Sequence, residues 1–439
     1  MEEALLKGLF LYLRFMTLEQ LHQLFLEFPQ ICTDTRKISP NCIFFALKGD
    51  NFNGNSYAAQ ALEKGASYAI VDEREFAGSD RTILVENVLT TLQNLSQFHR
   101  NYCKTKVIGL TGSNGKTTTK ELITAVLSRK YKTIATKGNL NNHIGVPLTL
   151  LSIAPDTEMA IVEMGANHLT EIEFLCKLAM PDYGYITNFG KAHLEGFGSE
   201  EGVIKGKSEL YDFLTSHDKF IFFNADDPIQ KNKLTKVSKK YGFSQNNNEF
   251  FKIKLIGADP FVKIAVDDVH ITTQLVGSYN FTNCCAAILI GKFFNVGLSE
   301  IKKGIENYIP QNNRSQIIDK NGHHIILDAY NANPTSMKAA LENFQQLKAD
   351  HKVAFLGDMF ELGKMAGKEH QEIANMAANM NIDQVFLIGE NFFQTKDSFN
   401  RFRSFDHLKE ALNSNTLKNA TILIKGSRGM ALERILDLL

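Results

Sequence analysis

The strongest chemical signal in this 439-residue sequence is a glycine-rich loop within residues 107–118, Val-Ile-Gly-Leu-Thr-Gly-Ser-Asn-Gly-Lys-Thr-Thr. Glycines let backbone N–H groups turn inward around phosphate oxygens, and the N-terminus of a following helix adds its dipole. The Lys116 ammonium is placed to reach the β- and γ-phosphates of a nucleotide, and the Thr117 hydroxyl is placed to bind Mg²⁺. Leu110 replaces the first glycine of the usual G-x-x-x-x-G-K-[ST] pattern, so the loop is a shorter variant. The residues expected to line the phosphate site are Gly112, Ser113, Asn114, Gly115, Lys116, Thr117 and Thr118.

Two more polar side chains stand close behind expected strands. Glu163 ends an expected strand at 160–163, and His193 follows another at 185–187. The carboxyl ends of parallel strands face the ligand crevice of an α/β sheet, and carboxylate oxygens suit Mg²⁺. Either residue alone is more often an ordinary loop acid or a hydrogen-bonded histidine. Combined with the phosphate loop, both are predicted to bind magnesium.

Two asparagine-rich segments, 138–147 and 328–334, each precede an expected helix. Asn, Gly and Pro favour turns for local reasons, so either segment alone is interpreted as a turn. The second segment follows an expected strand at 325–327, which places it on the crevice-facing edge of a sheet.

The elements that must position these residues are short apolar strands alternating with helices. Near-continuous apolar strands of this kind indicate parallel sheets covered on both faces, and hence an α/β fold. The clearest expected strands are Tyr68–Val71, Thr82–Val85, Val107–Leu110, Ala160–Glu163, Tyr185–Thr187, Phe220–Phe223, Ile325–Leu327, Val353–Leu356, Val385–Ile388 and Thr421–Ile424.

Two polar breaks divide the chain. One lies at 101–106 and the other near 310–313, which predicts three domains at 1–105, 106–309 and 310–439. Polar, strand-like sequence at 245–248 and 250–256 predicts a small sheet at the edge of the middle domain.

Composition excludes several classes of protein. Apolar residues make up 44% of the chain and charged residues 22%, which is typical of globular domains and not of disordered chains. Lys plus Arg equals Asp plus Glu at 48 each, so no basic field exists to hold nucleic acid. The six cysteines contain no C-x-x-C pair and are predicted to be buried, reduced thiols.

The start of the chain is apolar, and 5–28 is interpreted as a helix that belongs to the domain core or forms an oligomer contact, the core being the commoner role of such a stripe. Glu2, Glu3, Lys7 and Arg14 interrupt it, which argues against a secretory segment. A cytoplasmic protein without membrane insertion is predicted.

The combination of motifs resembles the ATP-dependent Mur ligases, which build the peptidoglycan stem peptide. The phosphate-loop variant is shared by all Mur ligases and by folylpolyglutamate synthase. Four other segments are typical of the branch that adds D-alanyl-D-alanine to UDP-N-acetylmuramoyl-tripeptide: EMGANH (163–168), AHLEGFG (192–198), DAYNANPTSM (328–337) and LGDMFELG (356–363). Shorter matches are found at 34–36, 46–49, 138–147, 224–227, 277–287 and 425–428, so the resemblance covers nearly the whole chain.

The resemblance implies an N-terminal domain that binds the UDP substrate, a central P-loop-type domain that binds ATP, and a C-terminal Rossmann-like domain that closes over ATP and binds the dipeptide. It also implies roles for individual residues. For the UDP end of the substrate these are Thr33, Asp34, Arg36 and Lys48; for ATP, Asn142, Asn283, Arg314 and Asp328; near the reacting centre, Tyr330 and Asn331; and for two Mg²⁺ ions, Thr117, Glu163 and His193.

The family also uses a lysine that CO₂ carbamylates into an anionic magnesium ligand, in the pattern Lys-x-x-[LI]-[FY]. Lys207 fits this pattern and Lys205 does not. Without the resemblance, Lys207 would be interpreted as a solvated helical lysine.

The implied reaction makes an acyl phosphate from a substrate carboxylate and ATP, and the dipeptide amine then attacks it. A monomeric enzyme of cell-wall synthesis, supporting cell shape and division, is expected. Three alternatives stay open from the sequence. The first is a sister ligase or folylpolyglutamate synthase, and the second is a nucleotide-driven switch or transport ATPase that releases ADP without an amine. The third is a silent binding protein, which would be expected to lack Lys116 or Glu163.

Overall fold

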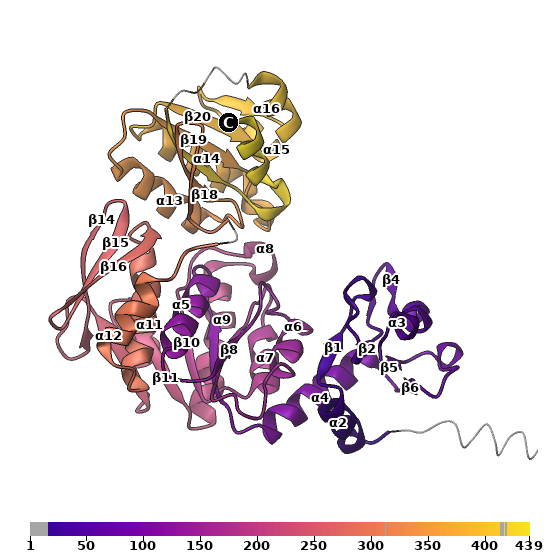
Figure 1. Ribbon diagram of the computed structural model, residues 1–439. Coiled ribbons are helices and arrows are strands. Elements are labelled where there is room, and N and C mark those ends of the chain that lie inside the picture. The colour runs from indigo at the N-terminus through magenta and orange to yellow at the C-terminus, as the bar shows by residue number, and fades with distance from the viewer. Residues whose placement is uncertain (1–15, 312, 413–416, 418) are drawn as a thin grey trace, which may run out of the picture. The chain divides into compact units, whose positions relative to one another are not determined.

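The computed structural model describes residues 16–311, 313–412, 417 and 419–439, which form layered α/β structure (Figure 1). The described chain forms two compact units. One comprises the residues up to 109 with 132–164 and 174–182, and the other comprises 110–131, 165–173 and 183–439. The largest sheet has seven strands in the order β13-β12-β11-β10-β7-β9-β8.

The first unit begins with a four-stranded parallel sheet in the order β1-β2-β5-β6. Its core includes Phe25, Ile43, Ile70 and Leu92, all almost fully buried. The elements of this part are α2 (Leu18–Glu27), β1 (Gln30–Cys32), β2 (Cys42–Phe45), β3 (Lys48–Gly49), β4 (Phe52–Asn53), α3 (Ala58–Glu63), β5 (Tyr68–Val71), β6 (Thr82–Leu84) and α4 (Val88–Tyr102). Further along the chain this unit contains most of β7 (Lys106–Thr111), β8 (Thr133–Ala135), α6 (Gly145–Leu150), β9 (Met159–Glu163) and most of α7 (Glu171–Ala179). The helix α5 (Lys116–Leu127), which follows β7, belongs to the second unit.

In the second unit, the apolar helix α11 (Asn280–Phe293) is buried on all sides, as expected of a helix inside a core. It packs against α5, where the absence of a side chain at Gly291 leaves room for Val126. The neighbouring elements are β10 (Tyr183–Ile186), α8 (Leu194–Phe197), α9 (Glu200–Ser216), β11 (Phe220–Asn224), α10 (Pro228–Lys233), β12 (Lys240–Ser244), β13 (Phe251–Lys252), β14 (Lys254–Ala258), β15 (Phe261–Val266), β16 (Val269–Val276) and α12 (Leu298–Glu306).

The C-terminal part of this unit has a six-stranded sheet in the order β17-β18-β22-β19-β20-β21, antiparallel only where β17 meets β18. Register pairs Asp328 with Lys425, so the carboxyl ends of β18 and β22 lie side by side. The elements are β17 (Gln316–Lys320), β18 (His323–Asp328), α13 (Pro334–Gln346), β19 (Lys352–Gly357), α14 (Ala366–Ala378), β20 (Gln384–Ile388), α15 (Glu390–Phe393), β21 (Asn400–Phe402), α16 (Phe405–Ala411) and β22 (Thr421–Lys425).

All ten expected strands are present within two residues of their predicted ends, and the α/β class is confirmed. The predicted small sheet is also present as β14-β15-β16. The strand expected at 245–248 is wrong. There the Ser244 hydroxyl accepts hydrogen bonds from the N–H groups of Asn246 and Asn247, and local bonds of this kind favour a turn over a sheet ladder.

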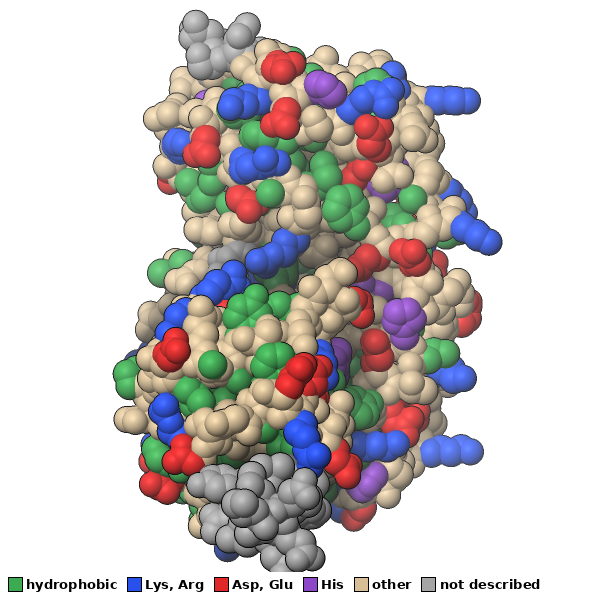
Figure 2. Space-filling view, turned by 90° about the vertical axis from the view of Figure 1, so that its right-hand side faces the viewer, with side chains coloured by type: hydrophobic (Ala, Val, Ile, Leu, Met, Phe, Trp, Pro, Cys, Tyr) green, Lys and Arg blue, Asp and Glu red, His purple; other side chains and the backbone are tan. Residues whose placement is uncertain are grey.

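Of the helix predicted at 5–28, residues 5–15 lie outside the described residues, and α2 covers 18–27 with Leu21, His22 and Phe25 buried. All six cysteines are buried, and none forms a disulfide within the described chain. Over that same part, no helix has the length and apolar character needed to cross a bilayer. Figure 2 shows basic and acidic side chains intermixed on the face in view.

A buried histidine pair joins two helices of the first unit. Nε2 of His99, on α4, lies 2.8 Å from the carbonyl oxygen of Ile153. Because a carbonyl oxygen can only accept a hydrogen bond, the His99 ring must donate from Nε2. Its Nδ1 is therefore left to accept from Nε2 of His22 on α2, at 3.0 Å. Both rings are 1% exposed, so burial lowers the pKa of each below the ordinary value of 6.5.

We expect the packing of α2 on α4 to weaken as pH falls below about 6.5. Because both pKa values are lowered by folding, each imidazole takes up its proton at a higher pH in the unfolded chain than in the folded one. Their contribution is therefore complete above the unfolded pKa and is lost on acidification, by up to about 1.4 kcal/mol per pH unit per histidine. Hydrogen exchange of the α4 amides, corrected for intrinsic rates, measures the loss. The His99→Gln variant should show a shallower pH dependence, and an unchanged slope would contradict the assignment.

Candidate nucleotide-binding site

The phosphate loop links β7 to α5 in a conformation that requires glycine at two positions. Gly112 has φ 142° and Gly115, the N-cap of α5, has φ 76°, both unfavourable for residues with a side chain. A Cβ at Gly112 would also lie 2.0 Å from Oγ1 of Thr187, and one at Gly115 would lie 2.5 Å from Oδ1 of Asn283. The Thr187 and Asn283 side chains therefore leave no room for a Cβ at these two glycines.

The segment that follows β10 braces this loop. The N–H of Ser113 donates to the carbonyl of Asn188 (3.0 Å), and the N–H of Asn114 donates to Asn188 Oδ1 (3.1 Å). In return, the Thr187 hydroxyl and the Asn188 amide donate to the Asn114 carbonyl at 2.6 and 3.0 Å. The Ser113 hydroxyl donates to the carbonyl of Gly190. These bonds hold the loop open at the N-terminus of α5.

Lys116 and Thr117 occupy the first turn of α5. The Lys116 ammonium donates to the carbonyls of Gly112 (2.6 Å) and Ser113 (3.2 Å), so it lies over the mouth of the loop. Thr117 is 5% exposed, and Thr118 is half-buried. An ammonium that bridges two loop carbonyls is positioned to transfer its contacts to phosphate oxygens.

Asn283, predicted to contact adenine, lies behind the loop. Its Oδ1 accepts from the Thr119 hydroxyl at 3.0 Å, and its amide donates to Asn280 Oδ1 at 2.9 Å. These bonds tie α11 to α5 beside Gly115. The adenine contact stays a prediction.

Glu163 ends β9 in the first unit and is 1% exposed. The Asn141 amide donates to its Oε1 at 2.8 Å, and its own N–H donates to the Thr136 hydroxyl at 3.0 Å. Asn142, expected near the phosphates, is exposed and accepts from the N–H groups of Ile144 and Gly145 at the start of α6. The asparagine-rich segment 138–147 thus holds a buried carboxylate and starts a helix.

His193 forms an ion pair with Glu361, which lies in the LGDMFELG segment after β19. Both residues adopt left-handed backbone conformations, with φ 53° and 62°, which are costly for residues other than glycine. The N–H of Glu195 donates to the Glu361 carbonyl, and the His193 ring lowers the pKa of the Glu361 carboxyl. The two strained residues are therefore held facing one another.

A second ion pair lies close by along the chain. The Lys191 ammonium contacts the 3%-exposed Glu369 carboxylate on α14 at 2.9 Å, and the Lys191 N–H donates to the Thr335 hydroxyl. Together with the pair of His193 and Glu361, it connects the segment after β10 to the C-terminal sheet's helices.

Lys207, on α9, is fully buried, whereas Lys205 two residues earlier is exposed. Its ammonium donates to the carbonyl of Ala166 at 2.9 Å and lies 5.0 Å from the centre of the Phe197 ring. Burial lowers the pKa of Lys207 well below its ordinary value, and the positive charge of Lys116 lowers it further. Lys207 is therefore not a solvated surface lysine.

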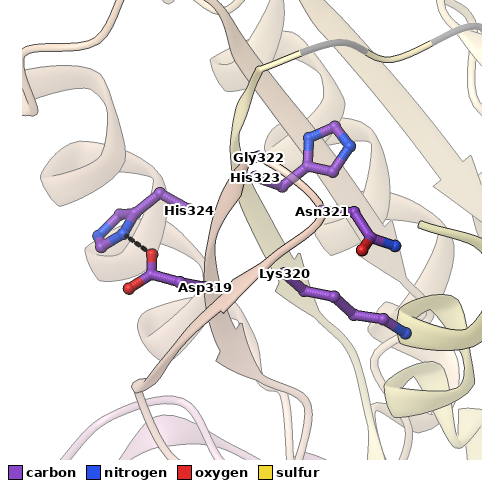
Figure 3. A pocket seen from close by; sticks show the side chains of 6 residues that line it. All are labelled: Asp319, Lys320, Asn321, Gly322, His323 and His324. Carbon is purple, nitrogen blue, oxygen red and sulfur yellow. Dashed lines mark hydrogen bonds and ion pairs between the residues drawn. The ribbon is translucent and has the colours of Figure 1, made fainter.

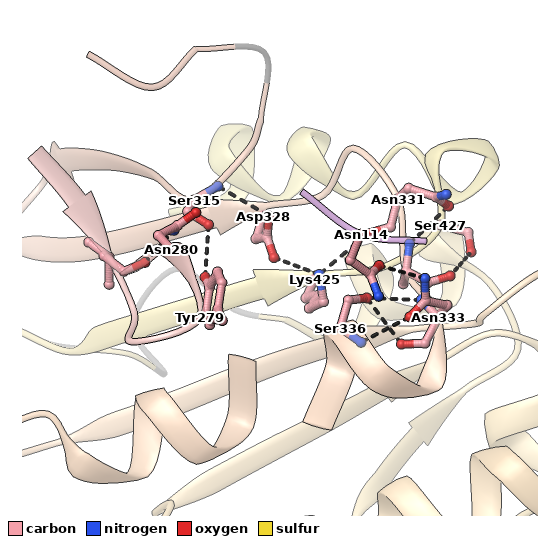
Figure 4. A network of polar contacts seen from close by, with 12 residues as sticks. Asn114, Tyr279, Asn280, Ser315, Asp328, Asn331, Asn333, Ser336, Lys425 and Ser427 are labelled. Carbon is pink, nitrogen blue, oxygen red and sulfur yellow. Dashed lines mark hydrogen bonds and ion pairs between the residues drawn. The ribbon is translucent and has the colours of Figure 1, made fainter. Parts of the chain in front are cut away.

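Asp328 is part of a polar network at the carboxyl edge of the C-terminal sheet (Figure 4). Its carboxylate accepts from the 2%-exposed Lys425 ammonium at 2.5 Å and from the N–H of Ser315 at 3.1 Å. Ser315 in turn contacts the Tyr279 hydroxyl, 2.8 Å away. Burial, followed by the charge of Asp328, raises the pKa of Tyr279.

The same network reaches the phosphate loop. The amide of Asn333, which caps α13, donates to Asn114 Oδ1 at 2.7 Å (Figure 4). Tyr330 and Asn331 lie between Asp328 and this cap, and the Arg314 guanidinium stacks on the Tyr330 ring 3.6 Å from its centre. The structure thus pairs Asn114 with Asn333, Arg314 with Tyr330, and Asp328 with Lys425.

The expected residues of the N-terminal domain form local charge pairs. Asp34 accepts from the Arg36 backbone and guanidinium, which lowers the pKa of its carboxyl to about 2. The exposed Lys48 ammonium contacts Asp72 and Glu73, both at 2.8 Å. Thr33 is half-buried beside them in sequence, and the substrate role of all four stays a prediction.

A shallow pocket at the turn between β17 and β18 contains none of the predicted residues (Figure 3). It is lined by 319–324, where His324 Nδ1 contacts Asp319 Oδ1 at 2.7 Å. Because this turn is at the amino end of β18, it lies at the edge opposite Asp328, away from the usual ligand crevice.

The structure adds functional candidates that sequence reasoning missed: Thr187, Asn188, Lys191, Glu361, Glu369 and Lys425. Most of them lie within or next to the sequence motifs described above, and that proximity was the signal that could have identified them. Because their partners are distant along the chain, the sequence pattern did not predict which residues would pair. No cluster of three or more His, Cys, Asp or Glu side chains suited to a metal occurs in the part of the chain described.

A parallel sheet, a glycine loop and a Lys-Thr helix start define a P-loop nucleotide-binding protein. Three family descriptions match the chain: "Mur ligase family, catalytic domain" at 27–104, "Mur ligase middle domain" at 110–291, and "Mur ligase, glutamate ligase domain" at 313–428. The chain belongs to the Mur ligase family.

Its relatives include the UDP-N-acetylmuramoyl-tripeptide–D-alanyl-D-alanine ligases of Bacillus subtilis and Escherichia coli, at 36% and 33% identity. Each alignment covers 92% of both chains. Among solved structures, MurF from Acinetobacter baumannii is 30% identical with a TM-score of 0.82, over 93% of each chain. MurF from Thermotoga maritima in complex with ADP is 25% identical with a TM-score of 0.81, over 93% of this chain and 96% of that one.

Replacing Gly112 by alanine should weaken ADP binding at least about tenfold, because the new Cβ must displace Thr187 from the loop it braces. Isothermal titration with ADP measures the loss. Gly367→Ala on α14 is the matched control, since its added Cβ would meet no atom within 4 Å. Equal ADP affinity in the Gly112→Ala variant and the control would contradict the role of the loop.

Proposed function

We propose that this chain is an ATP-dependent ligase that joins D-alanyl-D-alanine to UDP-N-acetylmuramoyl-tripeptide. The products would be UDP-N-acetylmuramoyl-pentapeptide, ADP and phosphate, in the synthesis of peptidoglycan precursors. The observation that carries the proposal is the braced loop at 112–118, joined through Asn114 to the DAYNANPTSM segment. Relatives named for this reaction, aligned over nearly their whole length, support the same substrates. A cytoplasmic monomer is part of the proposal.

The chemistry explains why a carboxylate-to-amide ligase needs a phosphate loop. Oxide is a very poor leaving group, so the carboxylate must first take the γ-phosphoryl group of ATP as an acyl phosphate. That transfer depends mainly on positioning and charge neutralisation. Lys116 would hold the phosphates during transfer, while Arg314 and Asp328 would orient the nucleotide from the C-terminal domain. Tyr330 and Asn331 would lie near the reacting centre.

Two of the residues proposed for Mg²⁺ offer the oxygen ligands that the ion prefers: the Thr117 hydroxyl and the buried Glu163 carboxylate. His193 would add an imidazole nitrogen. Glu361 on one side of His193 would fix the orientation of its ring, as partners of metal-binding histidines do. When bound, two magnesium ions would neutralise negative charge on the nucleotide and the carboxylate.

Burial of Lys207 supports carbamylation at this residue. A lysine amine reacts with CO₂ in its neutral form, and a buried site that disfavours the ammonium favours that form. The resulting carbamate anion would be stabilised by the nearby positive charge of Lys116 and would supply oxygen ligands for magnesium.

Lys207→Ala should reduce ligase activity at least about 100-fold, while Lys205→Ala on the same helix should remain near wild type. Carbon-13 NMR with labelled bicarbonate provides the second readout. Wild type and Lys205→Ala should both show a carbamate signal that Lys207→Ala lacks. A signal retained in Lys207→Ala would place the modification elsewhere.

The ligase proposal is tested by phosphate release from Mg-ATP and UDP-N-acetylmuramoyl-tripeptide, with and without D-alanyl-D-alanine. We expect release to require both substrates and mass spectrometry to identify the pentapeptide product. Release that ignores the dipeptide but responds to another amino acid would favour a sister ligase. Release that needs no amine would favour a nucleotide-driven switch.

A further inference from the structure

We propose that Arg428, which shares the Tyr330 ring with Arg314, binds the C-terminal carboxylate of the acceptor dipeptide. This inference rests on the proposed function and names a residue that recognises the second substrate. It starts from an unbalanced pair of positive charges in the C-terminal domain.

The ring of Tyr330 carries two guanidinium groups. The Cζ atom of Arg314 lies 3.6 Å from the ring centre and that of Arg428 lies 4.8 Å from it. Each cation is attracted to the ring, but the two cations repel one another because they share it. Two like charges held together in this way form a site that gains stability when an anion binds.

Within the described ranges, no carboxylate pairs with either of these two guanidinium groups, and Nε of Arg314 is buried without an acceptor. Asp328 is near in sequence, but its oxygens accept from Lys425 and Ser315. By contrast, Arg403 stacks on Phe393 at 4.2 Å and has its own partner, Glu390, at 3.0 Å.

The place of the pair in the fold fits a dipeptide. Tyr330 follows the end of β18 and Arg428 follows the end of β22, and these two strand ends are paired in register. Ligands of open α/β sheets bind at this edge. A dipeptide spans at most roughly 7 Å from amine to carboxylate, so its carboxylate must lie close to the reacting centre. Tyr330 is assigned to that centre in the proposed function.

Arginine suits a carboxylate better than lysine does, because its planar fork donates two parallel hydrogen bonds. In the proposed function Lys116 already holds the nucleotide phosphates, and Arg314 orients the nucleotide. Arg428 is exposed, so its guanidinium is accessible to an incoming substrate. The geometry therefore favours the dipeptide carboxylate over a nucleotide phosphate as the anion.

The test compares D-alanyl-D-alanine with its C-terminal amide, which keeps the reacting amine and removes the negative charge. Arg428→Met should lower kcat/KM for the dipeptide roughly 10- to 100-fold, with little change for the amide and none in the KM for ATP. Arg428→Lys should recover part of the loss. Arg403→Met is the matched control, because it also removes an arginine stacked on an aromatic ring, and it should match wild type with both acceptors.

Three results would overturn the inference: equal loss with dipeptide and amide, a raised KM for ATP that identifies a phosphate as the anion, or wild-type kinetics in Arg428→Met. Unfolding temperatures of all variants separate misfolding from lost recognition, and a misfolded methionine variant leaves the lysine variant to decide. Failure of the proposed function looks different, since wild-type protein would then show no release of phosphate dependent on the dipeptide.

Discussion

The rest of this structure depends on the tight glycine turn that carries the chain from the end of β7 into the start of α5. The positive φ angles at 112 and 115 favour glycine, and a Cβ at either position would clash with the side chain of Thr187 or Asn283. The loop cannot hold that shape alone, so hydrogen bonds from the segment after β10 surround Asn114. Burial of α11 behind the loop, through Asn283, completes the support.

The second feature of the molecule is its treatment of positive charge. Lys207 is buried with one carbonyl partner, whereas Lys425 is buried with a carboxylate partner. Arg314 and Arg428 share a ring without an acid among the described residues. Burying or crowding cations costs free energy unless an anion arrives, so sites of this kind are expected where anionic substrates bind. In the proposed reaction ATP and the UDP-linked tripeptide are anionic, and the dipeptide carries a carboxylate.

Much of the fold was predictable because near-continuous apolar runs are a clear sequence pattern for buried strands. Tyr68–Val71 was predicted to the residue, and the P-loop was placed between a strand and a helix, as found. Short or exposed strands such as Lys48–Gly49 carry no such pattern and were not foreseen. The wrong strand at 245–248 shows the limit of the method, since serine and asparagine side chains satisfied backbone groups locally.

The sequence by itself determined the α/β class, the phosphate loop and the residues most suited to nucleotide chemistry, because these follow from local spacing. The tertiary structure decided which of these residues meet. It paired His193 with Glu361 and Asn114 with Asn333, and it buried Lys207 while leaving Lys205 exposed. Such pairings join residues more than 150 positions apart along the chain, and burial depends on what packs over a helix. Neither the pairing of distant residues nor the burial of one lysine can be predicted from local sequence spacing.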